Sequence, residues 1–440
     1  MMDVSILNLK AICAFCATGF FLDQDTYYEN EVFHLDKFPW FYTPRTMTFC
    51  QAVDEFSQLF ETITREQLDS KRVILALSGG LDSRTQAVAL KGRSNVVAYS
   101  YQFCHSFNEN KYGEAIASRM NVPFFGFTIP QGYLWQEIDK LAQWNECNAE
   151  FTAPRQMAIA DEFRSMGDVF YLGHWGDVLF DDMGVPDNLP FDNQVDVVIN
   201  KIVKKSGFEL ADTLWKNWQL DGTFRAYIFD RIRTLLQAIP IDNANARIRA
   251  FKSLYWLPRW TKVNLCVFEQ FHPVALPYCD ERMWNFICSI PETYLAGRQI
   301  QIEYIKRKAP ELARIPWQPF NPCNLYNYQQ YHNFPFNAQV FTTKVIRRIC
   351  EMVSGQRCVE RNWELQFIGQ SNNVFLSNYL LKNDAIDGLV PKDIRKFFFD
   401  KFYNGDANQQ IWYAHSISML LTLSLFAIKF HNEYNINRDE

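Results

Sequence analysis

One short segment constrains the fold more than any other part of the chain. The apolar, β-favouring run at residues 72–77 ends abruptly in Ser-Gly-Gly-Leu-Asp-Ser (78–83), and a helical stretch follows to residue 90. A continuous apolar run of this length is typical of a parallel strand buried on both faces. The sequence therefore predicts a strand, a glycine-containing turn and a helix in immediate succession, which is the first unit of a parallel sheet.

Strands and helices alternate on both sides of this unit. Further strands are expected at 96–101, 122–128 and 169–172, and helices at 50–67, 109–120 and 151–164. This alternation predicts an α/β fold with a doubly wound parallel sheet, whose ligands bind at the carboxyl ends of the strands. The strand signal fades after residue 190, and the patterns at 200–249 and 338–428 are mostly helical.

The charge balance bears on the class of partner. The chain has 440 residues, with 44 Lys and Arg against 49 Asp and Glu, a net charge of -5. Sequence-independent nucleic-acid binding needs a basic face, so we expect no nucleic-acid partner. The apolar stretches at 11–21 and 417–428 are too short to span a bilayer, and the second is interpreted as a buried core helix.

The cysteines indicate the compartment. An odd number, 11, is spread irregularly without a secretory leader pattern, which is typical of free thiols in a reducing environment. We therefore predict a cytoplasmic protein. Cys13 and Cys16 form one CxxC pair, interpreted as two buried small residues, with metal binding or redox chemistry as the alternative.

The loop at 78–83 has three features that suit a phosphate. Gly79 and Gly80 let the backbone approach closely, with backbone angles closed to other residues, and the following helix offers unpaired N–H groups. The hydroxyls of Ser78 and Ser83 add donors. Asp82 would repel phosphate unless it holds Mg²⁺, so it is predicted to be a metal ligand. The alternative is a structural turn with Asp82 capping the helix, but the full string after a strand favours nucleotide binding.

Ser-Gly-Gly-Leu-Asp-Ser resembles the pyrophosphate-loop motif of N-type ATP pyrophosphatases. It lacks the lysine of a Walker A loop, which argues against γ-phosphoryl transfer. Residues 50–430 resemble the synthetase domain of the asparagine synthetase family, and the segments that carry this resemblance besides the loop are 109–117, 173–180 (Gly-His-Trp-Gly-Asp-Val-Leu-Phe), 271–291 and 416–430. The resemblance implies a sheet of the adenine nucleotide alpha hydrolase-like type with a mostly helical C-terminal half.

Members of that family adenylate a carboxylate with ATP, release pyrophosphate and let an amine attack the adenylate. The resemblance implies nucleotide contacts from Leu77, Ser78, Gly79, Gly80, Asp82, Ser83, Ser100 and Gly173. It implies Mg²⁺ held by Asp82 and Asp177. The substrates would be a carboxylate-bearing small molecule, peptide or glycan, together with an amine donor.

The chain departs from the family in its first part. Residues 1–50 resemble only the end of the family's glutaminase domain, so we expect no glutamine hydrolysis by this chain. Ammonia, another amine or a separate glutaminase would then supply nitrogen. Residues 51–190 are predicted to form the ATP pyrophosphatase-type α/β core and 191–440 the helical part.

Two substitutions affect the expected second step. His174 stands where the family has a glutamate that helps to deprotonate the amine, and it either takes that role or only packs in the cleft. Glu303 stands where the family has a lysine, whose charge Arg298, Lys306 or Lys308 could replace, although such lysines are more often solvated. The predicted catalytic residues are His174, Lys306 and Arg298.

Three functions remain open at the level of sequence. The first is an AMP-forming amide ligase. The second is another pyrophosphate-loop enzyme, such as a tRNA-modifying one, which the acidic charge and the lack of a second CxxC pair disfavour. The third is a degenerate nucleotide-binding scaffold, which His174 and Glu303 favour and the retained Asp82 and Asp177 disfavour.

Overall fold

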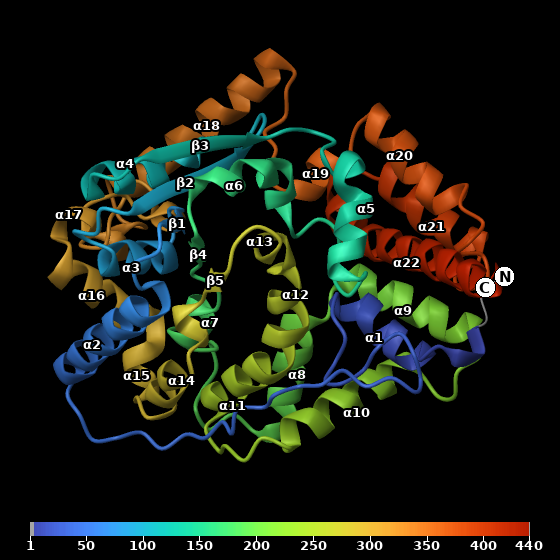
Figure 1. Cartoon of the computed structure of the whole chain (residues 1–440), viewed down its shortest axis with the longest axis horizontal. Coiled ribbons are helices and arrows are strands. Elements are labelled where there is room, and N and C mark those ends of the chain that lie inside the picture. The colour runs from blue at the N-terminus through green and yellow to red at the C-terminus, as the bar shows by residue number, and fades with distance from the viewer. Residues whose placement is uncertain (1–3, 440) are drawn as a thin grey trace.

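A five-stranded, all-parallel sheet organises the protein, with strand order β3-β2-β1-β4-β5 (Figure 1). The computed structural model describes the backbone of residues 4–439 and the side chains of residues 5–430. The strands are β1 (Val73–Ala76), β2 (Val96–Phe103), β3 (Phe124–Ile129), β4 (Val169–Tyr171) and β5 (Val274–Ala275). Val73 is in register with Val96 of β2 and with Val169 of β4, so β1 is the central strand. The predicted parallel α/β sheet is confirmed.

Helices cover both faces of the sheet. On one face, α4 approaches β2 so closely that a Cβ on Gly113 would lie 2.9 Å from the Cβ of Ser100. On the other face, Phe163 at the start of α6 packs against Tyr99 with ring centroids 5.1 Å apart. Successive strand residues point to opposite faces of a sheet, so Ser100 contacts the helix layer on one face and Tyr99 the layer on the other. The doubly wound arrangement follows from these contacts.

The remaining chain is mostly helical. In Figure 1 helices α2, α3, α16 and α17 lie on one side of the strands, and α5, α20, α21 and α22 lie on the other. The helices up to residue 251 are α1 (Leu9–Thr18), α2 (Phe49–Leu68), α3 (Leu81–Ala89), α4 (Asn110–Met120), α5 (Leu134–Asn145), α6 (Phe163–Met166), α7 (Gly176–Leu179), α8 (Phe191–Ile202), α9 (Lys205–Asn217), α10 (Phe224–Gln237) and α11 (Ala244–Phe251). Those that follow are α12 (Lys262–Asn264), α13 (Cys266–Glu269), α14 (Glu281–Cys288), α15 (Glu292–Leu295), α16 (Gln299–Lys308), α17 (Pro310–Ala313), α18 (Phe336–Ser354), α19 (Asn362–Phe367), α20 (Gln370–Leu381), α21 (Lys392–Tyr403) and α22 (Ala407–Asp439).

The first and last parts of the chain meet on one side of the molecule. Both α1 and α22 pack against α9, so the first fifty residues contribute to the main hydrophobic core rather than forming a separate body. Tyr27 stacks on Phe426 with ring centroids 3.8 Å apart. Within the described residues, α22 is also the one helix long and apolar enough to cross a membrane, but 72% of its most apolar window is buried inside the protein. That burial agrees with the prediction of a core helix at 417–428.

Two expectations about the elements were wrong. Residues 151–164 do not form one α-helix, because a 3-10 helix (Arg155–Glu162) precedes the short α6 and Ile159 has non-helical backbone angles. The sheet is also not confined to residues 51–190, since β5 comes from the region expected to be helical. β5 has only two residues, too few to show a strand pattern.

Candidate functional site

The loop between β1 and α3 lies at the carboxyl edge of the sheet and opens onto a cavity of about 350 Å³. Its two serines hold it in shape: Ser78 N–H donates to the Ser83 hydroxyl (3.1 Å), and the two hydroxyl oxygens lie 3.0 Å apart. Gly80 is the N-cap of α3 and no side chain caps that helix, so its first N–H groups are available to a ligand. This geometry suits an anion at the carboxyl end of the central strand.

The glycines of the motif are needed for space rather than for backbone angles. Neither Gly79 nor Gly80 lies in the left-handed region, so the expectation of angles closed to other residues was wrong. A Cβ on Gly79 would overlap the Cβ of Gln318, whose N–H donates to the Gly79 carbonyl at 3.1 Å. Farther along the edge, a Cβ on Gly176 would overlap the carboxylate of Asp82. The loop is therefore packed from two sides.

Asp82 connects the loop to the residues at the start of α16. Arg298 forms an ion pair with its Oδ1, and Gln301 donates to the same oxygen at 3.1 Å. Burial raises the pKa of Asp82 to about 6, an effect that the Arg298 charge opposes and the Asp177 charge reinforces. Arg298 adopts left-handed angles (φ 61°) directly after Gly297 (φ 64°), so backbone strain is concentrated where this cation meets the loop.

Asp177, the second predicted metal ligand, lies in the first turn of α7 and is exposed. Its charge acts on both Asp82 and His174, so the three groups share one electrostatic environment. Among the described residues, no group of three or more His, Cys, Asp or Glu could hold a metal ion. Two carboxylates suit Mg²⁺ when phosphate oxygens complete its shell, so this donor set fits a metal that arrives with a nucleotide.

His174 lines the same cavity at the end of β4, next to Gly173. Its Nδ1 is buried and has no hydrogen-bond partner within the described structure, and its ring lies 6.4 Å from that of Phe268. Burial lowers the pKa of His174 to about 4, partly offset by the charge of Asp177. The imidazole is therefore neutral at pH 7, and its Nδ1 is a buried polar atom whose hydrogen-bonding capacity is unused within the described structure.

The predicted lysine does not reach the cavity. Lys306 lies over the ring of Tyr326 (5.4 Å to the centroid), and Lys308 pairs with Glu61 at 3.0 Å. Glu303 accepts from Arg307 one turn further along α16. Because a helix advances about 100° per residue, Gln301, which faces Asp82, and a residue five positions later lie on different faces. The catalytic role predicted for Lys306 is therefore wrong in geometry, and Arg298 is the cation that meets the loop.

The expected nucleotide contacts gather around the cavity. Seven of the eight predicted residues line it: Leu77, Ser78, Gly79, Asp82, Ser83, Ser100 from β2 and Gly173 after β4. Gly80, the eighth, caps α3 beside them.

Several lining residues were missed from the sequence. Arg155 contacts the Tyr101 hydroxyl at 3.4 Å, and Gln318 donates to Glu109 at 3.0 Å across the cavity edge. Phe268 adds an aromatic wall. A strand-loop-helix signal is local, whereas these residues come from three short helical segments that lie far apart in the sequence.

A buried arginine anchors the helix that follows the loop. Arg84 in α3 is fully buried and donates to the carbonyls of Ile315 (2.9 Å), Pro316 (2.9 Å) and Leu312 (3.3 Å). Burial lowers its pKa to about 10, so the guanidinium stays charged at neutral pH. These bonds hold α3 against the segment that leads to Gln318. They therefore help to position Gln318 over Gly79.

No protein-family model matches this chain, and no curated protein sequence matches it significantly. The chemistry of the site therefore has to be inferred from its own geometry.

Proposed function

We propose that the chain binds ATP with Mg²⁺ and adenylates a carboxylate, releasing pyrophosphate and then forming an amide with ammonia or another amine. The observation that carries this proposal is the loop 78–83, which leaves the central parallel strand and opens a helix onto a cavity of about 350 Å³. Polar and apolar walls of this kind suit a nucleotide at a strand's carboxyl end. The resemblance of the loop to the ATP pyrophosphatase motif, and of the sheet to the adenine nucleotide alpha hydrolase-like type, supports the same chemistry.

In this proposal each residue has a separate task. Ser78, Ser83 and the first N–H groups of α3 bind the leaving pyrophosphate, and Arg298 offsets its charge. Mg²⁺, held through Asp82 and Asp177, would supply further neutralisation of the phosphates. His174, a neutral side chain on the cavity wall, hydrogen-bonds the base or the acyl group. With a pKa near 4 it is a weak general base, which favours a binding role.

ATP–pyrophosphate isotope exchange tests the proposal directly. Exchange should depend on Mg²⁺ and on one carboxylic acid from a panel, because adenylation is reversible before the amine attacks. A wild-type chain that binds ATP but exchanges no pyrophosphate with any acid would contradict the ligase reading.

A degenerate nucleotide-binding scaffold is the second candidate. The observation that favours it is the Arg298–Asp82 ion pair, which already neutralises the carboxylate expected to hold the metal. ATP binding that is insensitive to Mg²⁺ would support this alternative.

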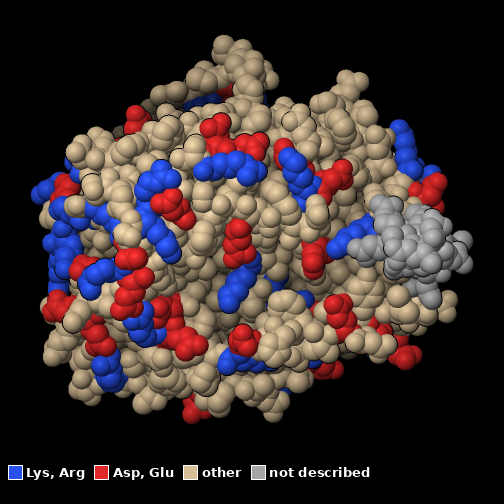
Figure 2. Space-filling model, viewed as in Figure 1, with Lys and Arg blue, Asp and Glu red and all other residues tan. Residues whose placement is uncertain are grey.

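A tRNA-modifying enzyme has less support, since Lys and Arg on the face in Figure 2 are interspersed with Asp and Glu rather than gathered in one basic patch.

A further inference from the structure

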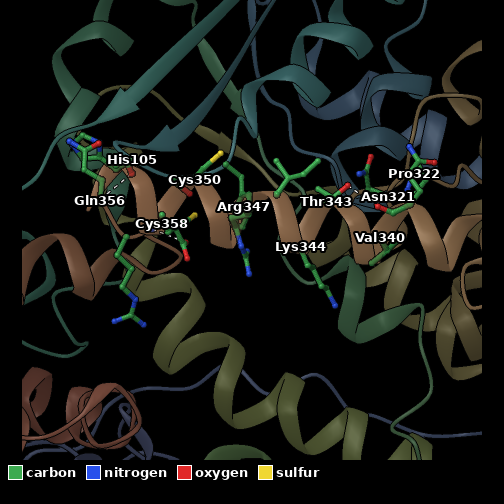
Figure 3. Close-up of a pocket in the computed structure, with 17 residues that line it drawn as sticks. His105, Asn321, Pro322, Val340, Thr343, Lys344, Arg347, Cys350, Gln356 and Cys358 are labelled. Carbon is green, nitrogen blue, oxygen red and sulfur yellow. Dashed lines mark hydrogen bonds between the residues drawn. The ribbon is translucent and has the colours of Figure 1, made fainter.

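A second and larger cavity, of about 590 Å³, lies along α18. Its walls come from α18, from the turn that follows β2 (His105, Ser106 and Phe107) and from the loop at Asn321 and Pro322. Figure 3 shows these elements arranged along one side of the helix, with Asn321 and Pro322 near Val340 and with His105 near its other end. A cavity of this size accommodates a small organic molecule.

The cavity has apolar walls, and its lining residues carry more cations than carboxylates, although Arg347 and Arg357 pair with Glu360 and Glu364 beside it. Phe107, Val340 and Ile346 supply apolar surface. The charged lining residues are three cations and one carboxylate: Lys344, Arg347, Arg357 and Glu351. The carboxylate is already engaged, because Glu351 accepts the N–H of Cys358 at 3.0 Å. An occupant with an apolar body and an anionic group matches this lining.

Two of the cations are suited to meet a ligand. Arg347 lies against the ring of Phe107 (5.0 Å) and forms an ion pair with Glu360 through one terminal nitrogen (3.3 Å), while its Nε is buried with no hydrogen-bond partner in the described structure. Lys344 has no carboxylate within ion-pair distance among the described residues. Figure 3 shows Lys344 and Arg347 extending from the same side of α18. They lie one turn apart, about 5 Å along the helix axis, so one anionic group can contact both.

The cavity borders the nucleotide site through two shared loops. Tyr101 and Glu109 line the nucleotide cavity, and the residues between them, 105–107, line the one along α18. Likewise Gln318 lines the first cavity and Asn321 the second. The Gln318–Glu109 hydrogen bond (3.0 Å) joins these two loops at their border. The two cavities are therefore adjacent, with the Gln318–Glu109 pair at their border.

We propose that the cavity along α18 binds the acid that the chain adenylates, and that this acid is an apolar-bodied dianion. One carboxylate extends past Gln318 toward the nucleotide, and the second anionic group lies on Lys344 and Arg347. The distance along α18 from Val340, beside the shared loop, to Arg347 is about 10 Å, so the body of the acid is at least of medium-chain length. This inference rests on the proposed adenylation and adds the class of its substrate.

Calorimetric titration with decanedioic acid and with decanoic acid tests the site. The wild-type chain should bind the diacid about tenfold more tightly than the monoacid, because the cations contact the extra carboxylate. Arg347→Gln should remove that preference. Arg348→Gln is the matched control, since it makes the same charge change on the same helix and Arg348 does not line the cavity. An equal preference in both variants would overturn the site.

ATP–pyrophosphate exchange provides a separate test of whether the bound acid is the substrate. Exchange supported by decanedioic acid, and reduced about tenfold by Arg347→Gln, would support it. Exchange that depends on some other acid, with no diacid binding, would overturn this inference while leaving the adenylation proposal intact. Failure of the wild-type chain to bind ATP, measured in its own titration, would instead strike the adenylation proposal, and with it the substrate role.

Discussion

The loop at 78–83 and the helix α18 border neighbouring cavities but are built in opposite ways. The loop is held by a hydrogen bond between its two serines and covered by Gln318, and the buried Arg84 anchors the helix that follows it. α18 has no buried residue over its 19 positions, and Met352 and Val353 are 83% and 84% exposed. Sites for a fixed chemical step need preorganised groups, whereas sites that admit different molecules tolerate looser walls. If the proposals hold, the rigid loop binds a constant ligand, the nucleotide, and the looser wall at α18 admits a range of acids.

The largest effect should follow from a change in the loop carboxylate. Asp82→Ala should reduce ATP–pyrophosphate exchange by at least about 100-fold, because it removes the proposed metal ligand and the carboxylate that pairs with Arg298. Asp192→Ala, at an exposed carboxylate paired with Arg233, is the control and should leave exchange unchanged. Near-normal exchange in the Asp82 variant would remove this residue from the metal site.

The anchor of the loop should dominate local stability. Arg84→Ala leaves buried carbonyls at Leu312, Ile315 and Pro316 without their donor, and should lower the free energy of unfolding by about 3 kcal/mol. Urea unfolding measures the loss. A change of a few tenths of a kcal/mol would mean that the segment before Gln318 does not depend on this anchor.

The Arg298–Asp82 pair should set the pH dependence on the acid side. Asp82 has a pKa of about 6 and must be ionised to hold the metal, so exchange should fall as the pH drops below 6. Arg298 lowers that pKa, so Arg298→Gln should move the falling limb to higher pH by about one unit. Arg307→Gln, on the same helix but paired with Glu303 and Asp54, should not move it. An unchanged limb in the Arg298 variant would assign it to another group.

The smallest effect should come from α18. Met352→Ser changes a side chain that is almost fully exposed, and should alter the free energy of unfolding by less than about 0.5 kcal/mol. The same urea titration provides the measurement. A loss comparable to that of Arg84→Ala would show that α18 packs against a surface in solution, and the contrast between the two regions would then fail.

Features formed by residues close together in the sequence could be predicted, whereas those formed by distant residues could not. Residues 72–90 contain a strand, a turn and a helix in direct succession, so the loop and its place at the sheet edge follow from the sequence alone. Arg298 lies 216 positions from Asp82 in the chain, and no pattern indicates which cation would meet it. The sequence also does not show whether Lys306 in α16 faces the loop, because the direction of its side chain depends on how that helix packs. β5 has two residues and pairs with β4 across about a hundred positions, which leaves no local signal.

That late strand has a consequence for synthesis. β1 to β4 are complete once residue 171 has emerged from the ribosome, but β4 remains an open edge until residues 274 and 275 follow. An unpaired strand edge is a template for mispairing between chains. At about 5–20 residues per second, the interval lasts roughly 5–20 seconds. A nascent chain stalled within that interval should therefore be the form most exposed to aggregation and most dependent on chaperones.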